Sequence, residues 1–216
     1  MPERATLLSL LLEQALIDVR VQKPRSSPAR GGTEYIRKLF YDGRRITRVD
    51  VSSAMQFFTH GATLLDIGCG YGNFTTEIER KFPVKAFGID IDRSRLLQGN
   101  NSSHVVCASW TAIPFPDDFF SRLVSCESFP RYPTFRTDLP PEEEIILTQR
   151  TLDELARVSQ QDTLWRGILP HSPDSRNRHL YVHNPTLVNN LPAMMNQSGW
   201  KITSVKDKIF CAVLAK

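Results

Sequence analysis

Residues 64–72 read LLDIGCGYG, an apolar run that ends in an acid and then turns through three glycines at alternate positions. Such a run predicts a buried strand, and glycines directly after it let a ligand approach bare backbone. The residues that follow can begin a helix, whose first amide groups would face the same ligand. The stretch therefore predicts a strand, a turn and a binding site.

The spacing of the glycines separates this motif from two other glycine loops. The dinucleotide fingerprint needs G-x-G-x-x-G, and the phosphate loop needs Gly-Lys followed by Ser or Thr. Neither pattern is present in 64–72. The motif resembles instead the first motif of the class I S-adenosylmethionine-dependent methyltransferases, an apolar pair, an acid and then G-x-G-x-G. The resemblance implies that Asp66, Gly68 and Gly70 bind the cofactor.

A second apolar strand is predicted over 84–89, after a helix that Pro83 ends. It leads into Asp90, where a doubly wound fold places the carboxylate that binds ribose. An ionised carboxylate only accepts hydrogen bonds, so Asp90 suits two vicinal hydroxyl donors. Ile91 is assigned to the same cofactor site, whereas Asp92 fits the N-cap of the next helix.

The stretch 104–110, followed by IPFPDDFF at 113–120, resembles the family's third strand, its adenine-binding turn and the run before its fourth strand. The family often has an acid where Ser109 stands. With a hydroxyl there, Ser109 and Trp110 would hold adenine more by stacking than by a charge-assisted bond. The alternative is that Trp110 is a core or surface aromatic. Glu127, after the fourth strand, completes the expected cofactor residues.

The resemblance runs from about residue 63 to 216 and implies an α/β fold. This fold is a doubly wound, seven-stranded, mostly parallel sheet of the Rossmann-like kind, with its last strand antiparallel. Apolar periodicity and turn residues predict the later elements. They are a helix over 147–158, a polar turn at 159–161, a strand over 162–169, a helix over 186–198 that Gly199 ends, and paired strands over 201–205 and 209–214.

Length and composition suit one domain, since the chain has 216 residues of which 41% are apolar. We expect the S-adenosylmethionine-binding catalytic domain over 61–216, and over 1–60 an N-terminal helical extension and linker that forms part of a lid. The apolar run 7–12 is interrupted by Glu13, well before the roughly 20 residues of a membrane span. No membrane association and a cytoplasmic location are expected. Four cysteines without a Cys-x-x-Cys pair predict buried reduced thiols and no metal site.

The segment 20–48 is basic, with nine Lys and Arg against two acids, although the formal net charge of the whole chain is +4. It lacks the aromatic-interleaved groove that single-stranded nucleic acid needs. The Asn/Asp-Pro-Pro-aromatic signature of the family's nucleic-acid amino-methylating members is also absent. A solvated basic face is therefore expected, and nucleic acid is not an expected partner. In this fold the same segment commonly covers the ligand, so Tyr41 could face the sulfonium.

Two long connections, 129–141 and 170–185, follow the predicted fourth and fifth strands. Open α/β sheets bind ligands at this edge, so we expect both connections to form the walls of the substrate site. Arg131, Tyr132 and Tyr181 are the expected substrate residues. The two tyrosines join Tyr41 as candidates for positioning the reacting groups, and no catalytic residue is assigned.

These expectations describe an S-adenosylmethionine-dependent methyltransferase that acts on a small-molecule acceptor. Two alternatives remain open. One is a cyclase or lyase, in which the methionine moiety of the cofactor attacks its own side chain and methylthioadenosine is released. The other is a regulatory protein that binds the cofactor without turning it over.

Overall fold

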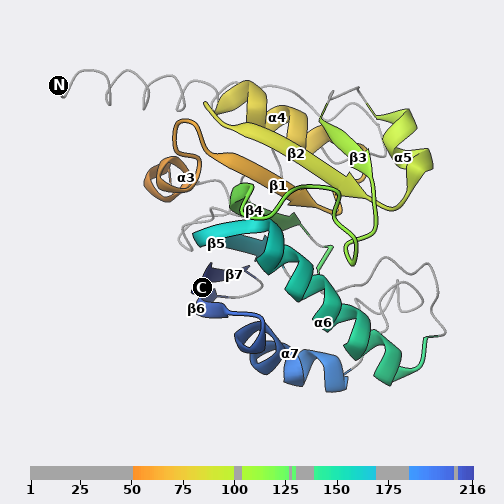
Figure 1. The fold of residues 1–216 in the computed structure, drawn as a ribbon. Coiled ribbons are helices and arrows are strands. Elements are labelled where there is room, and N and C mark those ends of the chain that lie inside the picture. Colours follow the sequence, from red (N-terminus) through yellow and green to blue (C-terminus); the bar gives the residue numbers. More distant parts are fainter. Residues whose placement is uncertain (1–50, 100–103, 127, 130–138, 169–184, 207–208) are drawn as a thin grey trace.

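The computed structural model describes residues 51–99, 104–126, 128–129, 139–168, 185–206 and 209–216, and helices alternate with strands through most of them (Figure 1). This alternation confirms the expected α/β class. In chain order the elements are α3 (Val51–Phe57), β1 (Thr63–Ile67), α4 (Asn73–Lys81), β2 (Lys85–Asp90), α5 (Arg93–Gln98), β3 (Val105–Cys107), β4 (Phe120–Cys126), α6 (Pro141–Val158), β5 (Ser159–Ile168), α7 (Pro185–Gln197), β6 (Trp200–Lys206) and β7 (Ile209–Leu214).

The described strands form one seven-stranded sheet in the order β3-β2-β1-β4-β5-β7-β6. Strands β1 to β5 pair in parallel, and β7 lies antiparallel between β5 and β6. The chain moves outward from β1 to β3 and then returns to β4 on the other side of β1. This reversal is a topological switch point, and the sheet confirms the expected doubly wound fold with an antiparallel last strand.

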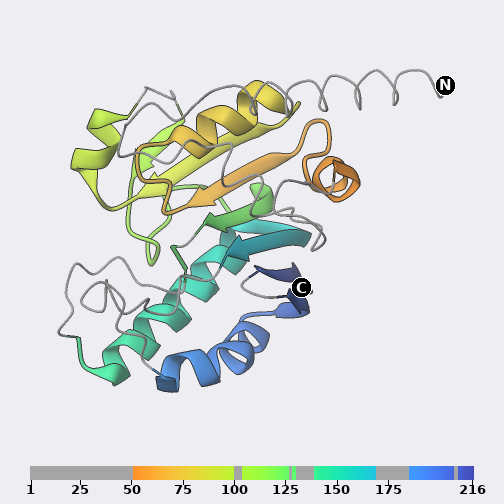
Figure 2. The same cartoon turned by 180° about the vertical axis from the view of Figure 1, so that it is seen from behind.

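Helices α6 and α7 cover one face of the sheet (Figures 1 and 2). Leu152 and Leu155 of α6 and Leu191 of α7 share a core with Trp165 and Phe210 from the strands below. The apolar face predicted over 147–158 is therefore the face that α6 buries. Burial of such large side chains contributes roughly 1.5–3 kcal/mol each, so this layer is a major source of stability.

Helices α3 and α4 cover the opposite face, where a second core forms. Phe57 of α3 and Ile78 of α4 pack with Leu64, Val124 and Ile168 of the sheet. Helix α3 thus belongs to the packed domain, although it precedes the boundary expected at residue 60. Residues 1–50 lie outside the described part of the chain, and the N-terminal extension and lid stay a prediction there.

Three local predictions about helix ends and hairpins are confirmed. The side chain of Asp92 accepts hydrogen bonds from the amides of Ser94 and Arg95 and so caps α5. Gly199, two residues after the end of α7, has a φ of +83°, the left-handed conformation that ends many helices. Strands β6 and β7 pair antiparallel, as their alternating sequences indicate.

Helix α6 begins six residues earlier than the predicted start at 147, because its first turn carries strong N-terminal signals. Pro141 occupies the first turn, and three acids follow it directly. Proline lacks the amide that this turn leaves unbonded, and carboxylates are favourable beside the positive end of a helix. These signals were present in the sequence and place the start at Pro141.

The polar turn expected at 159–161 is wrong, since α6 runs directly into β5 at Ser159. Ser159 pairs with Phe120 of β4, and the next register pair is Arg122 with Leu164. The residues between form a bulge in β5, in which Asp162 has a φ of +60°. A bulge of exposed polar residues has the composition of a turn, which is why the sequence indicated one.

None of the helices in the described ranges is long and apolar enough to cross a membrane.

Candidate functional site

The carboxyl ends of β1, β2 and β4 meet at one edge of the sheet, and the glycine turn leaves β1 there. Ile67, the last residue of β1, pairs with Ile89 on one side and Ser125 on the other. The amides of Gly68 and Cys69 both donate to the carbonyl of Ile89, at 2.9 and 3.0 Å. The turn is therefore fixed against β2 at the switch point, the position at which open α/β sheets bind ligands.

Asp90 ends β2 beside this turn, and each of its carboxylate oxygens accepts one backbone hydrogen bond. The amide of Gly70 donates to Oδ2 and the amide of Asp92 donates to Oδ1, both over 2.8 Å. A carboxylate has about four acceptor positions, so each oxygen keeps capacity for another donor. Ile91, 38% exposed, follows directly and offers an apolar surface at the same edge. The geometry is compatible with binding of a ribose diol.

The three glycines of the turn all have positive φ, but their surroundings differ. A Cβ on Gly68 would lie 2.6 Å from the Cβ of Ser128 and 3.0 Å from Cζ2 of Trp110. Among the described residues, a Cβ on Gly70 would meet nothing within 4 Å, at a φ of +57°. Gly68 is thus needed for packing, whereas Gly70 borders open space. Open space beside bare backbone is what a bound ligand requires.

Asp66 is only 2% exposed, and its Oδ2 accepts a hydrogen bond from the hydroxyl of Thr75 over 2.8 Å. Burial raises the pKa of Asp66 to about 7, while the bond from Thr75 opposes the shift and the nearby Asp90 adds to it. Asp66 therefore connects β1 to α4 beneath the site. The cofactor contact that the resemblance implies for Asp66 stays a prediction.

The thiol of Cys69 lies within the glycine turn and is buried. Burial, with the charges of Asp66 and Asp90, raises the pKa of Cys69 far above its ordinary value. The thiol therefore stays protonated at neutral pH, and a thiolate nucleophile is not available at this position.

Ser109 and Trp110 follow β3 at the same edge but lie in different surroundings. The hydroxyl of Ser109 is 2.9 Å from that of Thr111 and accepts from the Thr111 amide, which closes a tight turn. Trp110 is 3% exposed and packs in the α6 and α7 core. The structure thus favours the core alternative for Trp110, whose buried ring has no open face for adenine to stack upon. The ring packs closely against Gly68, where an added Cβ would lie 3.0 Å from Cζ2 of Trp110.

Five residues predicted for the site lie outside the described part of the chain. They are Tyr41, Glu127, Arg131, Tyr132 and Tyr181.

Two residues of the site were not found by sequence reasoning, Thr75 and Ser128. The hydroxyl of Ser128 donates to the carbonyl of Ile67 over 2.5 Å and so fixes the end of β1. Thr75 could have been suspected from its place in the first turn after the glycine motif. Ser128 carries no comparable signal, because its partner is 61 residues away in the sequence.

The cysteines correct one expectation. All four cysteines lie outside disulfides, but only Cys69 is buried, and Cys107 at the end of β3 is exposed. Within the described ranges, no group of three or more His, Cys, Asp or Glu side chains could hold a metal ion.

Comparison with known proteins assigns the region around the glycine turn to a methyltransferase domain. Residues 64–138, which carry β1 to β4 and the glycine turn, match the model of a methyltransferase domain family. A curated relative, sphingolipid C9-methyltransferase 2 of Gibberella zeae, is 28% identical over 79 residues. That alignment covers 32% of this chain and 15% of the relative, so the chain spans only a small share of that protein.

Solved structures share the architecture over most of the chain. An S-adenosylmethionine-dependent methyltransferase from Aquifex aeolicus has a TM-score of 0.53 at 17% identity, covering 87% of this chain and 100% of its own. A chain from the complex of the Haloferax volcanii Trm112 methyltransferase activator with a methyltransferase has a TM-score of 0.54 at 12% identity, covering 77% and 89%. The cyclase SpnF has a TM-score of 0.53 at 18% identity, covering 73% and 59%. At these identities the likeness shows the fold.

The sheet order, the glycine turn and the matched domain define a Rossmann-like methyltransferase fold. Residues 64–138 match a methyltransferase domain, and the architecture is similar to that of S-adenosylmethionine-dependent methyltransferases of known structure.

Proposed function

We propose that the chain binds S-adenosylmethionine at the carboxyl edge of β1 and β2 and transfers its methyl group to a small-molecule acceptor. The observation that carries the proposal is the carboxylate of Asp90, held by two backbone amides beside the open Gly70. A fixed acceptor pair next to uncovered backbone suits a ribose that continues into an extended chain. The matched methyltransferase domain supports the same assignment.

The three parts of the cofactor have separate neighbours in this arrangement. The ribose hydroxyls would donate to Asp90, and the methionine moiety would cross Gly70. The base would then lie toward β3, between Ile91 and the turn at Ser109. This order follows from the register, because Asp90 pairs with Cys107, two residues before Ser109. Ile91 takes the apolar role first assigned to Trp110.

The described residues of the site are suited to binding and positioning. The sulfonium of the cofactor supplies an activated methyl group, so in-line placement of the acceptor provides much of the rate. Neither Asp66 nor Cys69 is suited to covalent chemistry, since the first is buried beneath the turn and the second remains a thiol. The acceptor is therefore held by other residues, and Arg131, Tyr132 and Tyr181 are our candidates.

The proposed roles of the two tyrosines can be separated from cofactor binding. Tyr132→Ala and Tyr181→Ala should lower turnover and leave the dissociation constant for S-adenosylmethionine nearly unchanged. Loss of cofactor affinity in these variants would place them in the cofactor site instead.

Cysteines that form no disulfide suit a reducing compartment, and we extend the proposal to a cytoplasmic location.

The fold alone does not select the reaction, because the structurally similar SpnF is a cyclase. Analysis of the products distinguishes between methyl transfer, cyclisation or lysis, and binding without turnover. The protein is incubated with methyl-labelled S-adenosylmethionine and a cell extract, which is then separated into small-molecule, lipid, protein and nucleic-acid fractions. We expect S-adenosylhomocysteine and label in the small-molecule or lipid fraction, with no label when Asp90→Ala is used.

Each other result has a defined meaning. Label in the protein or nucleic-acid fraction would contradict the acceptor class. Methylthioadenosine formed from the cofactor alone would establish the cyclase or lyase alternative. Binding without any product from the cofactor would establish the regulatory alternative.

A further inference from the structure

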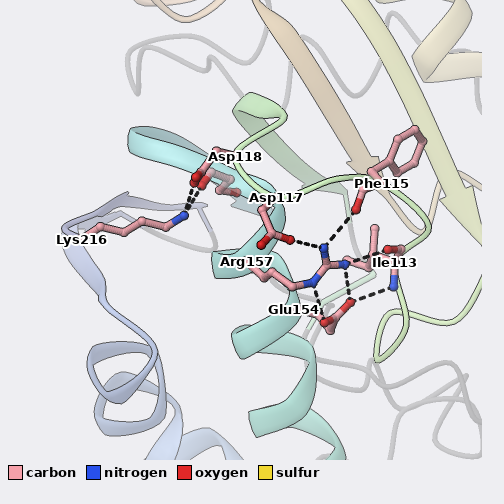
Figure 3. Close-up of polar contacts among 8 residues, drawn as sticks. Ile113, Phe115, Asp117, Asp118, Glu154, Arg157 and Lys216 are labelled. Atoms are coloured by element: carbon pink, nitrogen blue, oxygen red, sulfur yellow. Dashed lines mark hydrogen bonds and ion pairs between the residues drawn. The ribbon is translucent and has the colours of Figure 1, made fainter.

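The segment 109–118 lies between β3 and β4 and is hydrogen-bonded to the end of α6 through one arginine (Figure 3). Arg157 donates to the carbonyls of Ile113 and Phe115, at 2.9 and 3.0 Å. It also donates twice to the carboxylate of Glu154, at 2.8 and 2.9 Å, and once to Asp117, at 2.7 Å. These bonds use all five donors of the guanidinium group.

Glu154 completes the attachment from the same helix face. Its Oε2 accepts from the amide of Ile113 over 2.9 Å, so both backbone polar groups of Ile113 are bonded to α6. The hydrogen bond from Arg157 lowers the pKa of Glu154, which keeps the carboxylate ionised at neutral pH. The two side chains therefore form a charged clamp, defined here as Glu154 and Arg157, on the backbone of 113–115.

A second attachment lies at the end of the segment. The amide of Asp118 donates to the carbonyl of Arg157 over 3.0 Å, and Lys216 forms an ion pair with Asp118 (Figure 3). These contacts would keep the start of β4 in place when the clamp is weakened. A variant of Arg157 is thus expected to disturb 113–115 without unpairing the sheet.

The other end of the segment lies at the cofactor edge. The amide of Ala108 donates to the carbonyl of Asp90 over 3.0 Å, and Ser109 then begins the turn beside the proposed base. Only Trp110 to Ala112 separate Ser109 from the clamped Ile113. The backbone between a fixed strand end and a fixed Ile113 has little freedom, so the clamp determines where the turn at Ser109 lies.

We propose that Glu154 and Arg157 are positioning residues for the base of the nucleoside cofactor, acting through the segment 109–113. This inference rests on the proposed function, since it needs a nucleoside seated at Asp90. The clamp touches no cofactor atom itself. It lies on α6, outside the residues that the family resemblance or the sequence assigned to the site.

The test compares Arg157→Lys with Arg80→Lys. Arg80 forms the same paired bonds to a glutamate three residues away, Glu77, but it lies on the exposed side of α4 and its described bonds are within that helix. Lysine keeps the charge of Arg157 but has at most three donors and no planar fork, so the carbonyl bonds cannot all be kept. Titration calorimetry well below the melting temperature then gives the dissociation constants for S-adenosylmethionine and S-adenosylhomocysteine.

Arg157→Lys should raise both dissociation constants by about tenfold, and Arg80→Lys should leave both unchanged. Hydrogen exchange should rise over 109–115 in Arg157→Lys and not in β1. If Arg157→Lys does not fold, Glu154→Gln tests the same clamp with the smaller change of one charge. Wild-type affinity in a folded clamp variant with a lowered melting temperature would overturn the inference, because the clamp would then only stabilise the fold. If wild-type protein binds neither ligand, the proposed function fails first.

Discussion

The amide of Gly70 and the carboxylate of Asp90 are joined by a hydrogen bond of 2.8 Å across 20 positions of sequence. The carboxylate that suits a ribose diol therefore also shapes the turn that borders the open space. The two strongest sequence signals of the chain, the glycine motif and the acid after the second strand, form one structural unit. Perturbing either residue should affect the same ligand.

Gly68 and Gly70 should respond differently to the same substitution. Both have positive φ, so alanine adds a backbone cost of about 1–2 kcal/mol at either position. At Gly68 the new Cβ also meets Ser128, so Gly68→Ala should lower the melting temperature further than Gly70→Ala does. Gly70→Ala should keep the fold and lose at least tenfold in cofactor affinity. Circular dichroism and calorimetry measure the two effects.

The opposite pattern would contradict the assignment of open space at Gly70. If Gly70→Ala folds and binds S-adenosylmethionine like the wild type, the glycine serves only the turn.

Asp66 should make the stability of the protein fall as pH rises. Its pKa is raised by burial to about 7, while an unfolded aspartate titrates near about 4. Between these values the folded state holds a proton that the unfolded state has lost, so the free energy of unfolding decreases with increasing pH. The stability present below about pH 4 is lost through pH 7, a change of about 4 kcal/mol.

Asp66→Asn removes this titration and keeps an oxygen that can accept the Thr75 bond. The unfolding free energy of the variant minus that of the wild type, measured by denaturant at pH 4, 5.5 and 8, should increase as pH rises, because only the wild type loses stability. Parallel stability curves would show that Asp66 does not titrate in this range.

Cys107 offers a probe of ligand binding that needs no acceptor. Its thiol is exposed at the end of β3, beside the backbone of Asp90. Bound S-adenosylmethionine should therefore slow its reaction with a maleimide several-fold, as followed by mass spectrometry of the labelled peptide. Cys211 on the distant β7 is the internal control, and its rate should not change. Equal slowing of both thiols would indicate a global change rather than a local ligand.

Much of the fold could be predicted because its signals are local. The glycine motif, Pro83, the N-cap at Asp92 and the αL position at Gly199 each act within a few residues, and all lie where the sequence indicated. The junction of α6 and β5 could not be predicted in this way. There the strand begins without a turn, because Thr163 bridges the bulge through bonds to the carbonyls of Gln160 and Phe120.

In the candidate site, too, residues with a local sequence signal could be predicted and residues without one could not. Asp90 was predictable, since a strand of known direction places its last side chain at a known edge. Trp110 was not, because the choice between core and ligand depends on how closely the ring packs against Gly68, which is distant in sequence. The attachment of Ile113 to Arg157 joins residues 44 positions apart and has no local signal.

The most direct test of the account is a calorimetric titration of S-adenosylmethionine into wild type, Asp90→Ala and Asp92→Ala. Hydrogen bonds to a charged group are worth about 1.5–3 kcal/mol each, so Asp90→Ala should weaken binding by about 2–3 kcal/mol. Asp92→Ala removes the side-chain cap of α5 and the ion pair with Arg95, so it should lower the melting temperature slightly and leave affinity nearly intact. Wild-type affinity in Asp90→Ala, with weak binding in Asp92→Ala, would contradict the assignment of the ribose-binding acid and with it the proposed site.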